Sequence, residues 1–474
     1  MKKVIDILYI HPTKSMETAT YSIMPIGVVA LMNELQNRGF SVYGINYGIE
    51  KSIDQDYSLE EELLELDYKV LMLDIHWYVT SHGAVQIAEV SKRIHPDSPI
   101  VVGGITATIF AEEIIGKFPC MDYIVKGDSH RPVLELMDYL VHSKGTLEDI
   151  PNICYRVSGD IIDKGITHIC NSMEQLDFIT VDFLKNNRYF FTNTIYGVQR
   201  GFKFYWINNG RGCMYNCSYC GGSAANSPVM FGRKKMLIRS AASLVQDIER
   251  LYLQNVRIMG FTHDFEMFDE EYYKKIFSDI RSKGFRISLQ THCNQIPTKE
   301  FLKEMLTTFS RESSILDILP LTGDEQVRNE NGKVFSNAAL LDILEFMAQN
   351  QLRVRLIYAM QVPNESAESF GRTLEQIEYL AYNYPPKLLK ISCDWFIPDP
   401  ISPARTEKKF RIKNNRSSFD SYYEYCTGSN ENDPGYTDDI CMDLTHRLEL
   451  LNNLKDRLEA AGKKGIISIG SSVV

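Results

Sequence analysis

The chain lacks several features that would assign it at once to a structural class. Its 474 residues contain no run of about 18 apolar residues, so the sequence predicts no membrane-spanning helix. Ten cysteines are too few for a disulfide scaffold in a chain of this length. The net charge of −10 excludes the bulk basic surface that binds nucleic acid. We therefore expect a cytoplasmic protein that binds no nucleic acid and spans no membrane.

What is present is the composition of an ordinary globular protein, with 44% hydrophobic and 24% charged residues. The length is sufficient for two or three domains. Asp6 interrupts the first apolar run, which therefore predicts a buried strand and no signal peptide. We divide the chain into residues 1–145, a linker over 146–200, a second domain over 201–404 and an extension over 405–474.

Residues 1–145 alternate short apolar runs with helical patterns, which predicts a doubly wound, Rossmann-like parallel sheet of the α/β class. The expected strands are Val4–Ile10, Ser41–Tyr47, Val70–Asp74, Ile100–Gly103 and Tyr123–Lys126, and the expected helices are Pro25–Arg38, Ala84–His95, Ala107–Lys117 and Arg131–Tyr139. Ligands of such sheets bind beyond the carboxyl ends of the strands. The candidate ligand loops are therefore residues 74–78, 103–106 and 127–130, although their glycines are equally explained by tight turns.

Three cysteines stand close together in the middle of the chain, Cys213, Cys217 and Cys220, in a C-x₃-C-x₂-C spacing. Thiolates hold both iron–sulfur clusters and zinc, but a closed structural zinc site takes four protein ligands. Three ligands on one short loop predict a 4Fe–4S cluster with one iron left open. Two alternatives remain, namely zinc with His263 or His292 as fourth ligand, and a redox-active dithiol of Cys217 and Cys220.

Residues 201–404 resume the alternation of strands and helices, which predicts a partial (β/α)6 TIM barrel. The expected strands are Phe204–Asn208, Val256–Phe261, Phe285–Leu289, Ile315–Leu319, Arg353–Tyr358 and Leu388–Ser392. The expected helices are Ala242–Tyr252, Glu270–Lys283, Lys299–Thr307, Ala338–Asn350 and Glu368–Tyr382, with Thr298 and Asn337 as caps of the third and fourth. The cysteine loop follows the first strand, where barrels carry active residues.

The cysteine loop, with Tyr219 before its last cysteine, resembles the cluster loop of radical S-adenosylmethionine (radical SAM) enzymes. Three further segments resemble the cobalamin-binding domain that precedes many radical SAM cores: Pro25–Gly27, Val101–Gly104 and Val125–Asp128. Over residues 1–405 the chain is therefore similar to the cobalamin-dependent radical SAM methyltransferases.

This resemblance implies a set of cofactor ligands, while no catalytic residue is predicted. The cluster would be held by Cys213, Cys217 and Cys220; S-adenosylmethionine by Tyr219, Gly221, Gly222, Asp264, Gln290, Thr322 and Pro363; and cobalamin by Ile75, His76, Trp77, Gly103, Gly104, Thr106, Gly127 and Asp128. The chain lacks a D-x-H-x-x-G motif, so we expect no histidine beneath the cobalt. Bulky Trp77 and Tyr78 either cover the corrin face or fill its pocket.

The resemblance also implies a reaction. A 4Fe–4S cluster would cleave S-adenosylmethionine to a 5′-deoxyadenosyl radical, for cobalamin-dependent methylation of an unactivated carbon or phosphorus in a small metabolite, lipid or peptide. An electron donor such as flavodoxin or ferredoxin would be needed. Two alternatives are a radical SAM cyclase, rearrangement or oxidation enzyme of the same architecture, and a non-enzymatic iron–sulfur or zinc protein.

The C-terminal residues differ in texture from the two α/β domains. Residues 399–436 are rich in Asn, Ser, Asp, Lys and Tyr, which predicts an irregular lid or connector. Residues 443–461 carry leucines at helical spacing, which predicts an amphipathic helix that packs on the barrel. We assign no chemistry to the linker.

Overall fold

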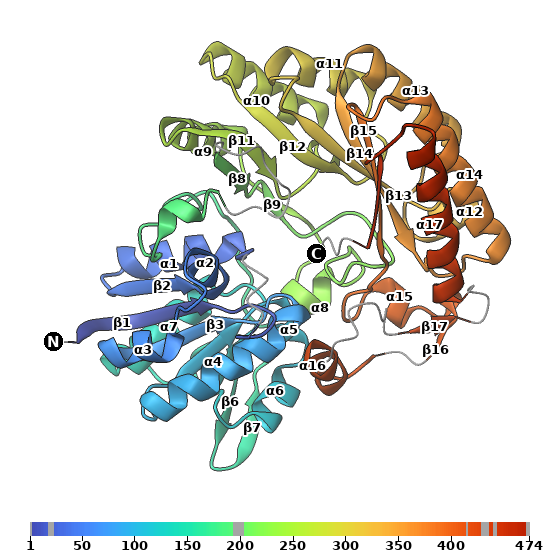
Figure 1. The fold of residues 1–474 in the computed structure, drawn as a ribbon. Helices are drawn as coiled ribbons and strands as arrows, with labels where there is room; N and C mark the ends of the chain where they lie inside the picture. Colours follow the sequence, from blue (N-terminus) through green and yellow to red (C-terminus); the bar gives the residue numbers. More distant parts are fainter. Residues whose placement is uncertain are drawn as a thin grey trace.

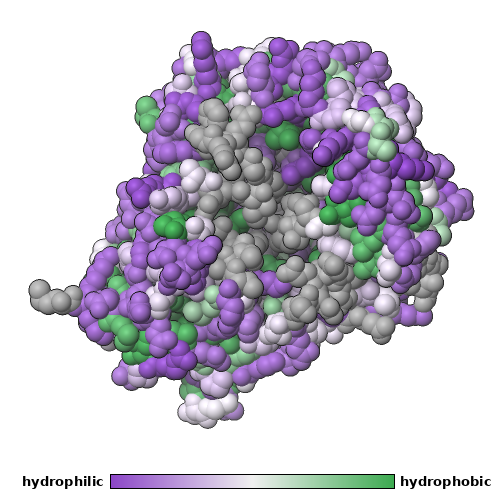
Figure 2. Space-filling view, viewed as in Figure 1, coloured by the Kyte–Doolittle hydropathy of each residue, from purple (hydrophilic) through white to green (hydrophobic). Residues whose placement is uncertain are grey.

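The computed structural model describes residues 2–17, 23–192, 203–413, 416–427, 436–438 and 443–470. Two seven-stranded sheets organise these residues, one in each of two α/β domains that lie one above the other in Figure 1. The face of the molecule in Figure 2 is mostly hydrophilic, with apolar side chains in scattered patches. Within the described ranges, every helix is too short or too polar to cross a bilayer.

The first sheet has the strand order β2-β1-β3-β4-β5-β6-β7 and confirms the predicted doubly wound domain. Its parallel strands are β1 (Lys3–His11), β2 (Val42–Asn46), β3 (Leu66–Asp74), β4 (Ile100–Gly103) and β5 (Tyr123–Val125). The sheet continues past residue 145, because the antiparallel hairpin of β6 (Ile153–Val157) and β7 (Asp160–Asp163) pairs with β5. Part of the expected linker therefore belongs to this sheet.

The helices of the first domain follow the predicted order with three additions, namely α2, α3 and η1, and one break. They are α1 (Ile26–Asn37), α2 (Tyr47–Ile53), α3 (Leu59–Glu65), η1 (Tyr78–Thr80), α4 (Ser81–Ile94), α5 (Ile105–Ile109), α6 (Ala111–Lys117) and α7 (His130–His142). The short helices α2 and α3 were not predicted, because seven residues are too few for a clear period. The helix expected over 107–117 is interrupted at Phe110, whose ring packs against Phe419 and Tyr422 from the C-terminal extension.

The second sheet is parallel throughout, in the order β18-β15-β14-β13-β12-β11-β8. Its strands are β8 (Lys203–Ile207), β11 (Val256–Phe261), β12 (Ser288–Cys293), β13 (Ile315–Leu321), β14 (Arg353–Met360), β15 (Leu389–Trp395) and β18 (Ile467–Ile469). The first six confirm the predicted partial barrel. The seventh strand, β18, comes from the extension and pairs with β15. It was not predicted, because three residues in a polar tail give no clear strand pattern.

Helices surround the second sheet close to the predicted ranges. They are α9 (Ala241–Leu253), α10 (Glu270–Ser282), α11 (Lys299–Thr308), α12 (Glu325–Glu330), α13 (Asn337–Gln349) and α14 (Ala367–Asn383). Thr298 caps α11 as expected, because its side chain accepts a hydrogen bond from the Phe301 amide. The cap predicted at Asn337 was wrong: the Ser336 hydroxyl accepts from the Ala339 amide, and Asn337 is already helical.

The remaining short elements lie around the cysteine loop and in the extension. They are η2 (Asn187–Tyr189), β9 (Gly210–Arg211), α8 (Ser227–Phe231), β10 (Leu237–Ile238), η3 (Phe265–Met267), α15 (Pro403–Thr406), η4 (Lys408–Phe410), β16 (Ile412–Lys413), α16 (Phe419–Thr427), β17 (Thr437–Asp438) and α17 (Leu444–Ala460). Of the expected lid over 399–436, residues 414–415 and 428–435 lie outside the described residues.

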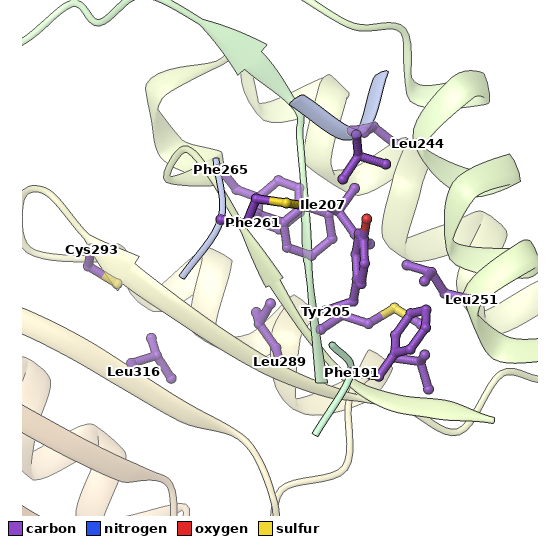
Figure 3. Packing of buried hydrophobic residues seen from close by; sticks show 14 of the residues in the cluster. Phe191, Tyr205, Ile207, Leu244, Leu251, Phe261, Phe265, Leu289, Cys293 and Leu316 are labelled. Atoms are coloured by element: carbon purple, nitrogen blue, oxygen red, sulfur yellow. The ribbon is translucent and has the colours of Figure 1, made fainter. Parts of the chain in front are cut away.

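The barrel core lies between its sheet and the helices that cover the sheet from outside. Figure 3 shows Tyr205 and Ile207 of β8 beside Phe261 of β11, with Phe265 and Leu289 packed in the same cluster. These side chains are at most 2% exposed. Their burial fixes the register of β8 and β11, and with it the place where the cysteine loop leaves the sheet.

The extension contacts both domains. Helix α16 packs on η1 and α4 of the first domain, and α17 packs on α14 of the barrel, which confirms the predicted packing of the amphipathic helix. A buried ion pair joins Arg447 of α17 to Glu365, both fully inaccessible. The hydroxyl of Thr322 also donates to Glu365, at 2.8 Å, so the carboxylate is satisfied inside the protein.

Candidate functional site

A cavity of about 700 Å³ lies between the carboxyl ends of the two sheets. The first domain lines it with residues from the loops after β3, β4 and β5, and the second lines it with the cysteine loop and the ends of β11 and β12. The principal polar and glycine residues on the two sides are His76, Trp77, Gly103, Gly104, Gly127 and Asp128, and Cys213, Cys220, Gly222, His263, Asp264 and His292. Carboxyl-terminal edges of parallel sheets are where α/β domains and barrels bind ligands.

Six of the eight residues predicted to bind cobalamin line this cavity, and Ile75 and Thr106 do not. Ile75 is fully buried, and its amide donates to the Gly103 carbonyl at 2.8 Å. The Thr106 hydroxyl donates to the His76 carbonyl at 3.2 Å. These two residues therefore hold the β3 and β4 loops together beneath the cavity surface.

The paired glycines after β4 form an open floor. A Cβ on Gly104, where φ is +109°, would lie 2.6 Å from the backbone of Ile75, so only glycine fits there. A Cβ on Gly103 would meet only the Val125 carbonyl oxygen, at 3.9 Å. The β4 loop thus lies close against the end of β3 and leaves free space above Gly103, as a site for a broad, flat ligand requires.

The two bulky residues after β3 point to different places. Tyr78 packs against Tyr422 of α16, with ring centroids 5.0 Å apart, and does not line the cavity. Trp77 does line the cavity and meets the His76 ring edge-on at 4.5 Å. Tyr78 therefore takes no space from a ligand, and Trp77 forms part of the cavity wall.

A buried polar cluster lies where β1 and β3 end. The Tyr9 hydroxyl donates to the Asp74 carboxylate at 2.6 Å, and Nδ1 of His11 lies 2.8 Å from the same oxygen. Burial would raise the pKa of Asp74, but His11 and Tyr9 outweigh it and hold that pKa below its usual value. Burial lowers the pKa of His76 to about 4, so its ring is neutral at neutral pH. Both Tyr9 and Asp74 line the cavity. Asp74 begins a predicted ligand loop, whereas Tyr9, which lies within β1, was not predicted as a site residue.

The cysteine loop faces the first domain across the cavity. Cys213 and Cys220 line the cavity, whereas Cys217 is 5% exposed and lies behind them. Burial, together with the thiols of Cys217 and Cys220, raises the pKa of Tyr219 well above its usual value. The described cysteines form no disulfides. The donor set is therefore three free thiols on one loop, which fits a cluster with one open iron.

A single-ion site is less well matched by these side chains. Ligands of one zinc ion lie within about 4 Å of each other, since each Zn–S bond is about 2.3 Å. In the ranges that the structure describes, no three Cys, His, Asp or Glu side chains are grouped in that way. The ring of His263 is engaged with the Gly212 carbonyl, 2.7 Å from Nε2, and so braces the loop. The thiols of a cluster, by contrast, each bind a separate iron.

Of the residues predicted to bind S-adenosylmethionine, Gly222 and Asp264 line the cavity. Burial raises the pKa of Asp264 to about 6, and its carboxylate accepts from the Asn294 amide at 2.8 Å. The residues that do not line the cavity are Tyr219, Gly221, Gln290, Thr322 and Pro363. The assignment of all seven residues to S-adenosylmethionine stays a prediction.

Two of those five residues make contacts within the protein that explain their presence without a ligand. The Gly221 amide donates to the Asp399 carboxylate at 3.0 Å, and a Cβ on Gly221 would lie 2.8 Å from the Pro400 carbonyl oxygen. Thr322 is fully buried against Glu365. Its position follows from β13, which continues to Leu321, beyond the expected end of that strand.

Aromatic and charged side chains from the barrel complete the wall. The His292 ring stacks on Trp206 with centroids 5.8 Å apart and an interplanar angle of 10°. Nδ1 of His292 lies 3.4 Å from the Asp317 carboxylate, which also receives two hydrogen bonds from Arg355. Because β12 continues to Cys293, His292 belongs to the strand itself, and its side chain is held at the cavity.

Asp128 joins the two domains at the edge of the cavity. This carboxylate, 1% exposed, pairs with Arg211 of β9 and with Arg233, and it accepts from the Cys170 amide at 2.9 Å. Burial would raise the pKa of Asp128, but the two guanidinium groups outweigh it and lower the pKa. Asp128, which was predicted to bind cobalamin, thus belongs to an ion-pair cluster between the two domains.

Comparison with known proteins shows what the chain and its fold resemble. Residues 13–137 match the B12-binding domain family. The whole fold resembles the folds of two solved enzymes. It is shared with TsrM of Kitasatospora setae, a radical S-adenosylmethionine methyltransferase whose structure holds cobalamin and a 4Fe–4S cluster: the TM-score is 0.67 at 15% identity, over 100% of this chain and 92% of that one. For OxsB, a cobalamin-dependent S-adenosylmethionine radical enzyme, the TM-score is 0.60 at 14% identity, over 96% of this chain and 62% of that one.

Two curated relatives resemble the chain in sequence. An anaerobic magnesium-protoporphyrin IX monomethyl ester cyclase of Cereibacter sphaeroides is 22% identical over 427 residues, which are 86% of this chain and 64% of the relative. An uncharacterized methyltransferase of Pyrococcus horikoshii is 23% identical over 209 residues, which are 44% of this chain and 42% of the relative. The chain therefore covers less than two thirds of the length of either relative.

The Asp128 cluster generates a stability prediction. Asp128→Asn removes the charge that compensates Arg211 and Arg233, and breaking a buried ion pair from one side costs about 3–5 kcal/mol. We expect a clearly lower thermal midpoint and faster proteolysis at the domain junction. Asp138→Asn is the matched control, because its pair with Arg38 is exposed and such pairs contribute about 0–1 kcal/mol. Equal midpoints for the two variants would contradict the proposed role of the junction.

Proposed function

We propose that this protein is a cobalamin-dependent radical SAM methyltransferase, which methylates an unactivated carbon or phosphorus of a small metabolite, lipid or peptide. The observation that carries the proposal is the two-sided cavity. Its floor is the Gly103–Gly104 turn of a B12-binding domain, and its opposite wall holds Cys213 and Cys220. A corrin and a cluster placed on these two walls would face the same cavity.

The residues present fit both cofactors. The open space above Gly103 accepts a macrocycle, and the neutral His76 and the Trp77 ring border the same floor. Three free thiols on one loop fit a cluster that keeps one iron for S-adenosylmethionine. When bound, these groups supply a 5′-deoxyadenosyl radical and a transferable methyl group.

The protein's own side chains would position the reactants and exclude water. Gly222 allows close approach of backbone to a ligand of the open iron, because it carries no side chain. The Asp264 carboxyl, with a pKa of about 6, can accept a hydrogen bond from a ligand amine or hydroxyl near neutral pH. Trp206 and His292 offer stacked rings against which a substrate can pack. The electron required would come from a flavodoxin- or ferredoxin-like donor.

A second candidate is a radical SAM cyclase of the same architecture. The observation that favours it is the Cereibacter sphaeroides relative, which is named as a cyclase and aligns with 86% of this chain. The cavity suits either reaction, since both need a radical formed beside a bound substrate.

The cluster proposal predicts a metal content. Anaerobically reconstituted protein should bind about four irons, and Cys213→Ala, Cys217→Ala and Cys220→Ala should each lose the visible absorbance of the cluster. Iron analysis and visible spectroscopy provide the measurement. Cys120→Ser, which removes a half-buried thiol elsewhere, should retain full iron content. One zinc and no iron in the purified protein would exclude the proposed function.

The floor of the first domain predicts a cobalamin-binding defect. Gly103→Leu places a side chain in open space above the β4 loop without a backbone clash. Cobalamin affinity should fall about tenfold or more, equivalent to about 1.4 kcal/mol. Binding is followed by equilibrium dialysis with visible detection. Gly371→Leu serves as control, because Gly371 lies on α14, outside the cavity lining, and a Cβ there meets nothing within 4 Å. Similar affinities for the two variants would refute this cobalamin site.

The products distinguish the two candidate reactions. With reductant, S-adenosylmethionine, methylcobalamin and substrate, methyl transfer should yield 5′-deoxyadenosine and S-adenosylhomocysteine together, measured by liquid chromatography and mass spectrometry. A cyclase should yield 5′-deoxyadenosine without cobalamin-dependent S-adenosylhomocysteine. Screening extracts for a molecule that gains 14 mass units identifies the substrate class. Cyclised or oxidised product with no mass gain would establish the second candidate.

A further inference from the structure

A fully buried lysine lies directly behind the cysteine loop. Lys333 has no exposed surface, although lysine is among the residues least often buried. It belongs to the turn that follows α12. Its Nζ donates a hydrogen bond to the Asn294 carbonyl oxygen at 3.0 Å. The position of this cation therefore needs an explanation that the fold alone does not supply.

The turn that carries Lys333 is fixed against the cysteine loop by backbone contacts. The Ser218 amide donates to the Asn331 carbonyl at 3.2 Å. At Gly332, φ is +87°, and a Cβ there would lie 2.6 Å from the Asn216 carbonyl oxygen and 2.9 Å from the Cys217 Cα. The two loops can approach so closely only because residue 332 is glycine.

The charge of Lys333 has little compensation from the protein. In the part of the chain that the structure describes, no carboxylate lies within ion-pair distance of its Nζ. Besides the Asn294 carbonyl, the Tyr219 ring lies near this ammonium group, with its centroid 5.7 Å from Nζ. A cation–π contact offsets only part of the free energy that burial of an ammonium group costs. A further negative charge nearby would balance the difference.

The electrostatic effect of Lys333 extends to the groups around the cluster position. Burial raises the pKa of the Asp264 carboxyl, and the charge of Lys333 acts against that rise. Asp264 lines the cavity, and Lys333 does not. The lysine therefore acts on the cysteine loop from its protein side.

We propose that Lys333 is the buried counter-charge of the iron–sulfur cluster and that it raises the reduction potential of that cluster. This inference rests on the proposed function. A cluster held by three thiolates is an anion, and it becomes more negative when it takes up an electron. A fixed positive charge in a poorly polarisable interior stabilises the reduced form more than the oxidised form. Lys333 accordingly does not bind the iron itself and acts on the cluster through the electric field of its charge.

A carboxylate of S-adenosylmethionine is the other anion that a lysine at this site could meet. The geometry favours the cluster, because Lys333, Tyr219 and Cys217 all lie outside the cavity lining, behind the loop. A ligand of the open iron would approach from the cavity side, where Cys213 and Cys220 are exposed to it.

The test is a redox titration of the reconstituted full-length protein without S-adenosylmethionine, followed by electron paramagnetic resonance. Lys333→Met removes the charge with little change in volume. At the wild-type midpoint, its ratio of reduced to oxidised cluster should fall about tenfold, which is 59 mV for a one-electron couple. Lys333→Arg should restore most of the wild-type ratio. Lys303→Met, which removes an exposed lysine on α11, should leave it unchanged.

Each other outcome is decisive. Lys333→Gln is titrated beside Lys333→Met and keeps a donor for the Asn294 carbonyl, so the charge is tested even if the methionine variant binds no cluster. An unchanged potential in a folded, iron-loaded variant overturns the inference. So does a variant with normal potential but weakened S-adenosylmethionine binding, which assigns the charge to the ligand carboxylate. Wild-type protein that takes up no iron refutes the proposed function itself. If the wild-type protein forms 5′-deoxyadenosine but the reduction potential of Lys333→Met is unshifted, only this inference is refuted.

Discussion

The ion-pair cluster of Asp128 with Arg211 and Arg233 is the interaction on which the site depends. It joins the last ligand loop of the first sheet to the chain on either side of the cysteines. A buried carboxylate between two guanidinium groups is stable only while all three remain together, since any one left alone would be an uncompensated buried charge. The cluster thereby holds the carboxyl edges of the two sheets face to face, and the cavity lies between these edges.

Close backbone contact is the second constraint, and it operates on both sides of the cavity. Gly104 lets the β4 loop lie against the end of β3, and Gly332 lets a turn of the barrel lie against the cysteine loop. Neither position tolerates a Cβ. The bulky residues are directed away or to the edges: Tyr78 packs on α16, and Trp77 stands in the wall. The space between the walls is left to ligands.

The sequence allowed most of this architecture to be predicted, because periodic apolar runs report burial directly. The parallel strands of the first domain and six strands of the barrel were recognised in that way. The hairpin of β6 and β7, and strand β18, were not, since short strands at a sheet edge carry little apolar pattern.

The cysteine spacing located one wall of the site. Lys333 escaped notice because a lysine in a turn looks solvent-exposed until the loop that covers it is placed. Asp128 was recognised as a ligand-loop residue, but its arginine partners are about 80 and 100 residues distant and cannot be paired from spacing.

The pairing of β18 with β15 has a consequence for synthesis on the ribosome. The edge of β15 stays unpaired until residues 467–469 have been translated, long after the cysteine loop and the B12-binding domain have emerged. Helix α17, which packs on α14, is completed only shortly before. Open strand edges are sites of aggregation. The nascent barrel therefore passes through a stage in which its sheet is incomplete. The last described strand to be synthesised, β18, completes that sheet at its edge.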